Sequence, residues 1–203
     1  ACDYSAGCAS MIALLDRLSG KKARADVYCL FTRAEEVGFV GAIGAAREKT
    51  LPRKLPIIAI ETSKALPGAR QGDGPVLRVG DKTSVFPPEV TAFCDRVAAE
   101  LSRRRKDFKY QRKLMDGGTC ESTAYVSYGY QATGMCVALG NYHNMDEKRR
   151  KIASEHIHLK DWQWMVDWFE AMALDKKGFG SEAATLRTRL DKRYQSYEKL
   201  LLA

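Results

Sequence analysis

The stretch VYCLFTRAEEVGFVGA, residues 27–42, decides how the fold is read. Its first residues are mostly apolar and belong to a buried strand that we expect over residues 26–32. Two adjacent glutamates, Glu35 and Glu36, come next, and the small residues after them predict a helix over residues 38–48. Like charges at the end of a buried strand repel each other and lose hydration, so we expect a cation beside them.

The rest of the chain continues to alternate strands with helices. We expect further strands at residues 55–61, 74–80, 108–114 and 133–139, the second of them at a sheet edge, and helices at residues 5–20, 87–105, 117–129, 159–174 and 181–203. This alternation predicts an α/β domain of three layers, helix–sheet–helix. A length of 203 residues fits a single domain over residues 1–203.

Composition narrows the class of protein. The chain is 45% hydrophobic and 29% charged, as in ordinary soluble proteins, and it has no apolar run long enough to span a membrane. Its six cysteines are scattered singly, which predicts reduced thiols and a cytoplasmic location.

The net charge of +8 is concentrated in residues 102–113 and 147–151. We do not expect a nucleic-acid partner, because no base-stacking or groove-reading motif accompanies these charges. A solvated helix end or an assembly surface are the alternatives.

Acidic residues and a histidine recur where strands are expected to end, which is where ligands collect in open α/β sheets. They are Asp3, Glu35, Glu36, Glu61 and His143, and a turn at residues 117–119 joins them. Carboxylates with a histidine suit a pair of close divalent cations, since one carboxylate can bridge both ions and the others bind one each. The paired glutamates are explained if one binds metal and its neighbour acts as a general base.

Five short segments follow one another along the chain: DYSAG at residues 3–7, AEEVGFVGA at 34–42, IAIETS at 58–63, GGTCES at 117–122 and VALGNYHNM at 137–145. In this order they resemble the catalytic domain of the co-catalytic metal aminopeptidases, the glutamyl/tetrahedral group. This group is of the same clan as the zinc aminopeptidases and aminoacylase-type deacylases. The resemblance covers residues 3–174 and implies a zinc-exopeptidase-like fold with a mixed, mostly parallel central sheet.

The resemblance also implies roles for the acidic residues. Asp3 would bridge two divalent ions, which could be Zn, Co or Mn. Glu36 and His143 would bind one ion and Glu61 the other, while Glu35 would be the general base.

The same resemblance places substrate contacts at Gly118, Thr119 and Cys120, where the family has Gly-Thr-Asp. Cys120 departs from that pattern, which puts substrate geometry in doubt more than metal binding. Peptide substrates and homo-oligomeric assembly are implied as well.

One family feature is missing from this sequence. The second ion of the family takes a histidine from a segment upstream of the bridging Asp, and only Ala1 and Cys2 precede Asp3 here. We therefore expect a chain that lacks an upstream segment and an inserted assembly domain. In this 203-residue form we expect little or no activity.

The leading hypothesis is a metal-dependent exopeptidase, an aminopeptidase that uses a metal-bound water. An N-acyl amino acid deacylase or carboxypeptidase-type metallohydrolase, or a non-catalytic assembly protein that keeps the fold, stay open.

Plainer readings of the same residues also stay open. Asp3 could cap the first helix, and the other acids and His143 could be solvated loop residues. We read His156 and His158 as structural or surface residues, and the tryptophans at 162, 164 and 168 as helix-packing residues and not as a substrate cage.

Overall fold

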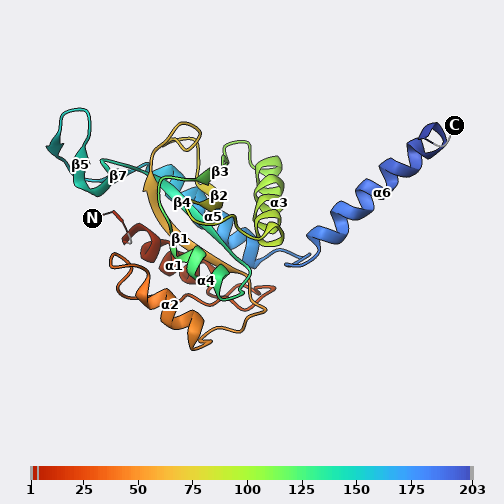
Figure 1. Cartoon of the computed structure of the whole chain (residues 1–203), viewed down its shortest axis with the longest axis horizontal. Helices are drawn as coiled ribbons and strands as arrows, with labels where there is room; N and C mark the ends of the chain where they lie inside the picture. Colours follow the sequence, from red (N-terminus) through yellow and green to blue (C-terminus); the bar gives the residue numbers. More distant parts are fainter. Residues whose placement is uncertain (1, 4, 202–203) are drawn as a thin grey trace.

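The computed structural model describes residues 2–3 and 5–201, which are arranged around one mixed β-sheet (Figure 1). The strand order is β1-β4-β2-β3, and the short strand β7 pairs with the end of β4. The strands are β1 (Ile57–Lys64), β2 (Val76–Asp81), β3 (Gln111–Met115), β4 (Ala132–Gly140) and β7 (His156–Ile157). The long pairings β1–β4 and β2–β3 are parallel, whereas β2–β4 and β4–β7 are antiparallel. The expected mixed, mostly parallel sheet is confirmed.

Helices cover both faces of this sheet. The helices α1 (Ser5–Leu18), α3 (Pro88–Arg104) and α5 (Leu159–Ala173) share one apolar core with β2 and β4. The helices α2 (Val40–Arg47) and α4 (Glu121–Ser127) form a separate core. Successive side chains of a strand point to opposite faces, and in β1 Ile58 and Ile60 pack on the first core while Ile57 packs on the second. The two cores therefore lie on opposite faces, and the three-layer prediction is confirmed.

The central strand β4 explains why this sheet is buried. All of its residues except Gly140 are buried, because helices cover both of its faces. Such a strand carries a continuous apolar run instead of alternating polar and apolar residues. The expected strand at residues 133–139 is confirmed with one added residue at each end.

Helix α5 provides the largest side chains of the first core. Trp168 is fully buried, and its indole Nε1 donates a 3.0 Å hydrogen bond to the carbonyl oxygen of Cys94 in α3. Trp164 and Met165 are buried beside it. The prediction that these tryptophans pack a helix is confirmed.

Two elements extend away from the layers. Helix α6 (Glu182–Leu201) projects from the rest of the molecule, and the hairpin of β5 (Met145–Asp146) and β6 (Lys151–Ile152) protrudes at the opposite end (Figure 1). The helix predicted over residues 181–203 is confirmed for its described part, and residues 202 and 203 lie outside the described residues. None of the described helices is both long and apolar enough to cross a membrane.

The strand predicted over residues 26–32 is wrong. This segment forms no sheet ladder, and Tyr28 and Phe31 are 60% and 49% exposed. In the described structure β1 pairs with β4 alone, so its other edge stays unpaired and the segment does not join the sheet there. Only Val27 packs against the first core.

Several predicted bounds also differ from the structure, and the strand predicted at residues 108–114 begins only at Gln111. Strand β1 continues three residues beyond Glu61, because Thr62 to Lys64 still pair with β4. Strand β2 lies between β4 and β3 and is not at an edge. The helix predicted over residues 117–129 begins only at Glu121, since the two glycines before it belong to a turn.

Candidate active site

Glu61 lies within β1, on the face that carries α2 and α4. Its Oε1 atom is buried and has no hydrogen-bond partner among the described residues. Burial raises the pKa of Glu61 to about 8, the nearby Arg78 opposes this rise, and Glu35, Glu121 and Asp3 add to it. A buried carboxyl group without a partner is costly, so this position is suited to a ligand that supplies positive charge.

Arg78 projects from β2 toward the same place and is 4% exposed. Its Nη1 donates a 3.2 Å hydrogen bond to Oγ of Ser63, whereas its Nε has no partner among the described residues. A cavity of about 100 Å³ lies against these polar groups. The residues that line it include Glu61, Arg78, Gly118, Thr119 and Tyr142.

The two adjacent glutamates lie in a tight turn before α2. The backbone N–H groups of Gly38 and Phe39 donate to the carbonyl oxygen of Glu35, at 2.8 and 2.9 Å. Ala34 and Phe39 have φ values of 57° and 60°, the left-handed region that most residues avoid. This turn leaves Glu36 exposed and Glu35 half-buried, so the two carboxylates have different surroundings.

The Glu35 carboxyl group is surrounded by negative charge. Burial is the largest cause that raises its pKa to about 7, and the charges of Glu36, Glu121 and Asp3 act in the same direction. At neutral pH such a group can both accept and release a proton, as a general base must.

Asp3 stands just before α1 and is tied to two distant segments. Its Oδ1 accepts a 2.5 Å hydrogen bond from Oγ1 of Thr62 in β1. Its backbone N–H donates a 3.5 Å hydrogen bond to Oε2 of Glu155, which also accepts from the N–H of Cys2 at 3.0 Å. Burial raises the pKa of Asp3, the Thr62 bond and His143 oppose this rise, and Glu155 adds to it.

His143 follows the end of β4 in a short 3₁₀ turn, Tyr142–Asn144. Its φ is 56°, and its exposed ring stacks on that of Tyr142 with 3.9 Å between the ring centroids. The pKa of Tyr142 is raised first by burial and then by the charges of Asp3, Glu61, Glu36 and Glu35. This turn therefore brings His143 to the edge of the acidic group.

The predicted substrate-contact residues are split between the cavity and the core. Gly118 and Thr119 line the cavity, but Cys120 is fully buried behind them. The N–H of Cys120 donates a 3.0 Å hydrogen bond to Oδ2 of Asp81, which also accepts from Oγ1 of Thr123 at 2.6 Å. Asp81 thus fixes the glycine turn that forms one wall of the cavity.

The predicted residues gather at one end of β1 and β4, but they do not converge on one point. The acidic residues are near enough for their charges to shift the pKa of another acid or of Tyr142. They are Asp3, Glu35, Glu36 and Glu61. Within residues 2–3 and 5–201, no three His, Cys, Asp or Glu side chains are close enough to hold one ion.

Sequence reasoning missed several members of this region. Glu121, which accepts a 2.6 Å hydrogen bond from Oγ1 of Thr32, raises the pKa of both Glu35 and Glu61. Glu155 and Arg78 were missed as well. The position of Glu121 directly after the glycine turn was an available signal, whereas nothing in the local sequence marks Glu155 or Arg78.

The donor set fits divalent metal ions in its chemistry. Carboxylates and imidazole are ligands of Zn, Co and Mn, and the mutual repulsion of the acids is relieved by positive charge. The unpartnered Oε1 of Glu61 is the clearest sign, because a buried carboxylate oxygen normally has a partner.

Comparison with known proteins places the chain in a family of peptidases. The family model described as M42 glutamyl aminopeptidase matches residues 1–156. A putative aminopeptidase from Acetivibrio thermocellus is 31% identical over 127 residues, which cover 58% of this chain and 35% of that protein. The chain therefore spans about a third of the length of this relative.

Solved structures agree with the fold. The TET1 peptidase of Pyrococcus horikoshii, described as assembling into a tetrahedron or a large octahedral shell, superimposes with a TM-score of 0.71 at 21% identity. The match covers 85% of this chain and 48% of that one. The aminopeptidase APDkam598 from Desulfurococcus kamchatkensis has a TM-score of 0.69 at 23% identity, over 85% of this chain and 47% of its own.

Proposed function

Because the chain belongs to the M42 glutamyl aminopeptidase family, we propose that it is a metal-dependent aminopeptidase that removes N-terminal residues from peptides. The observation that carries the proposal is the group of carboxylates around the buried, unpartnered Oε1 of Glu61. An acidic group of this kind, beside a cavity at the end of a mixed sheet, suits metal-assisted hydrolysis.

By family resemblance Asp3, Glu36 and His143 would hold one divalent ion and Asp3 with Glu61 would contribute to a second, and to do so these side chains must draw closer together than they are in this structure. When bound, such ions act as Lewis acids toward a peptide carbonyl and lower the pKa of water. The metal could be Zn, Co or Mn, since each accepts this donor set.

Glu35 is the residue best placed to move protons. It lies beside Glu36 in the turn before α2, half-buried, so it can remain free while its neighbour binds metal. Glu35 would take a proton from the attacking water and pass it to the leaving amine. Gly118 and Thr119, on the cavity wall, would position the substrate.

Two experiments test this function together. Elemental analysis of protein purified without chelators should find a divalent transition metal. Aminoacyl-anilides should be hydrolysed at most weakly by the 203-residue chain and faster by a form that carries an upstream histidine, whereas N-acetyl amino acids should be hydrolysed by neither. Hydrolysis confined to N-acetyl amino acids would favour a deacylase, and metal binding without any hydrolysis would favour a non-catalytic protein that keeps the fold.

Location and assembly belong to the same proposal. The six cysteines are free in the structure, which suits a cytoplasmic protein, and assembly of relatives into shells supports a homo-oligomer.

A further inference from the structure

Helix α6 presents a surface that the rest of the molecule does not use. Figure 1 shows it leaving the layered body as a straight extension, and Glu182 at its beginning is its one buried residue in the described structure. Leu186, Leu190, Tyr194 and Tyr197 are 47%, 56%, 50% and 58% exposed. Apolar groups at this exposure, in a helix with no neighbour, suggest a partner.

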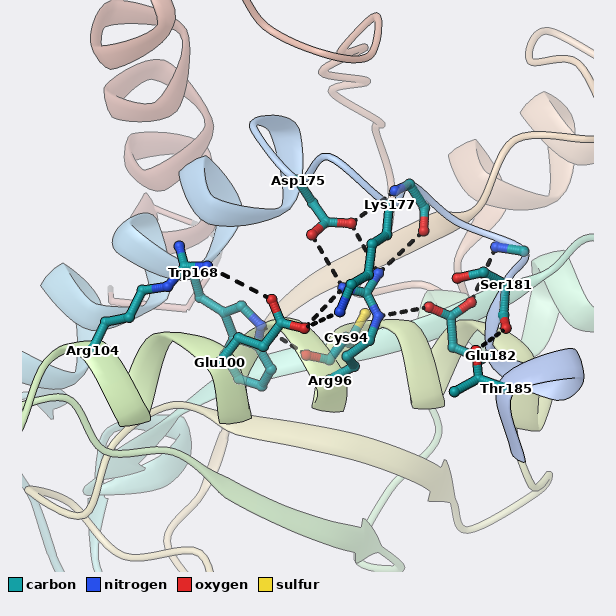
Figure 2. Close-up of polar contacts among 12 residues, drawn as sticks. Cys94, Arg96, Glu100, Arg104, Trp168, Asp175, Lys177, Ser181, Glu182 and Thr185 are labelled. Carbon is teal, nitrogen blue, oxygen red and sulfur yellow. Dashed lines mark hydrogen bonds and ion pairs between the residues drawn. The ribbon is translucent and has the colours of Figure 1, made fainter. Parts of the chain in front are cut away.

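The base of α6 is fixed firmly to α3 (Figure 2). Nε of Arg96 donates a 3.0 Å hydrogen bond to Oε1 of Glu182, and its Nη1 and Nη2 donate to both carboxylate oxygens of Asp175 at 3.1 and 2.9 Å. The N–H of Gly180 donates to Oε2 of Glu182 at 3.1 Å. These charge-assisted bonds set the direction in which the helix leaves the body.

Most of the large exposed apolar residues of α6 form one continuous stripe, and Leu200 lies beside it. They follow an eleven-residue repeat, in which Ala183 recurs as Tyr194, Leu186 as Tyr197 and Leu190 as Leu201. Such a repeat corresponds to about 3.67 residues per turn, so the stripe stays on one side of the helix along its length. Apolar stripes of this width are typical of helices that pair with another helix.

Charges on the two edges of the stripe favour a second copy of the same helix. Arg193 lies on one edge and Glu198, five positions later, on the other. In a parallel helix pair, a residue on one edge faces the residue about five positions later on the partner's other edge. Arg193 of each copy would then face Glu198 of the other.

Antiparallel pairing is disfavoured by the same charges. Equivalent edges would meet, and with the stripes centred Arg193 of one copy would approach Arg193 of the other, a like-charge contact that opposes the attraction between Arg187 of one copy and Glu198 of the other. A membrane surface also fits less well, because acidic residues, Asp191 and Glu198, flank one side of the stripe.

We propose that α6 is a self-association element, which pairs in parallel with α6 of a second copy through the stripe of Ala183, Leu186, Leu190, Tyr194, Tyr197 and Leu201. This inference does not depend on the proposed function, because α6 lies outside the residues that the family model matches.

The stripe is tested by a pair of substitutions to the same residue. Leu190→Asn, in the stripe, should weaken self-association about tenfold or more, and Thr188→Asn, on the opposite side of the helix, should leave it unchanged. Sedimentation equilibrium of the full chain measures both, and the mass of L190N should fall to half that of wild type at low micromolar concentration. Equal masses for wild type and L190N would overturn the proposal. So would a monomeric wild type that co-sediments with phosphatidylserine–phosphatidylcholine vesicles.

The direction of pairing is tested by reversing charges. Arg193→Glu and Glu198→Arg should each weaken association, because each places like charges face to face. The double variant R193E/E198R should restore association if the helices are parallel. Association that is weaker in the double variant than in either single variant would overturn the parallel arrangement, and unchanged association in both single variants would overturn the role of the charged edges.

Discussion

The hydroxyl of Thr62 donates a 2.5 Å hydrogen bond to Oδ1 of Asp3, which joins strand β1 to the residue just before α1. The two residues are far apart in the chain, so this bond fixes the direction of a carboxylate that local structure alone would leave free. Glu61, the neighbour of Thr62 in β1, is thereby held close to Asp3.

We predict that Thr62→Val lowers the affinity of the protein for Zn by about tenfold, because residues that orient a metal ligand commonly have effects of this size. Thr62→Ser keeps the hydroxyl and should retain wild-type affinity. Competition with a chromophoric chelator measures both. Equal affinity in T62V and wild type would show that Asp3 does not depend on this bond, or does not bind metal.

The adjacent glutamates should be separable by substitution. We predict that Glu35→Gln lowers kcat by about a thousandfold while the metal content stays at the wild-type level, since a general base is removed and no ligand is lost. Glu36→Gln should instead reduce the metal content.

Turnover of an aminoacyl-anilide, measured beside elemental analysis of the same samples, distinguishes the two roles. Full activity in E35Q would rule out Glu35 as the base. Loss of metal in E35Q with retention in E36Q would mean that the roles are exchanged.

Helix α2 packs closely against the glutamate turn because Gly41 has no side chain. A Cβ atom added at Gly41 would lie 2.4 Å from the carbonyl oxygen and 2.6 Å from the backbone nitrogen of Arg33, neither of which can move alone. Gly44, in the same helix, has no atom within 4 Å of such a Cβ.

We predict that Gly41→Ala destabilises the protein by about 1–3 kcal/mol through overpacking, and that it lowers activity because Arg33 leads into the turn of Glu35. Gly44→Ala should stabilise the helix by about 0.5–1 kcal/mol with unchanged activity. Urea unfolding at neutral pH compares the two variants. A G41A variant as stable and active as G44A would contradict the close approach of Arg33.

The candidate site could be predicted from the sequence only in part, and the division has a physical reason. Glu35 and Glu36 are recognisable because a short segment places them between an apolar run and a glycine-rich helix. Arg78 and Glu155 approach the same carboxylates through pairings between distant segments, which no local pattern records.

The fold, like the site, could be predicted from the sequence only in part. The apolar run of β4 is visible in the sequence because burial on both faces leaves it no polar position. Residues 26–32 also have an apolar pattern, yet they form no ladder, although the outer edge of β1 is unpaired in the described structure. The apolar pattern of a segment therefore does not by itself determine whether the segment pairs with a neighbouring strand.

Asp81 is 4% exposed and holds the glycine turn. Its Oδ1 accepts from the N–H groups of Thr83 and Ser84, at 2.8 and 3.0 Å, and its Oδ2 accepts from Cys120 and Thr123. Burial acts to raise the pKa of Asp81, but these four hydrogen bonds outweigh it, and the pKa lies below the usual value of 3.8.

Asp81→Asn replaces one acceptor oxygen with an NH₂ group that faces two donors, so we predict a loss of about 2–4 kcal/mol of stability at neutral pH. A carboxylate with a lowered pKa contributes its stability above pH 3.8, and this contribution is lost as the pH falls through the folded-state pKa. The difference in free energy of unfolding between wild type and D81N should therefore narrow below pH 3.8. Asp116→Asn, at an exposed position of the same turn, should show neither effect. Urea unfolding of the three proteins across this range tests the prediction, and a difference that stays constant into acid would show that the charge of Asp81 does not stabilise the turn.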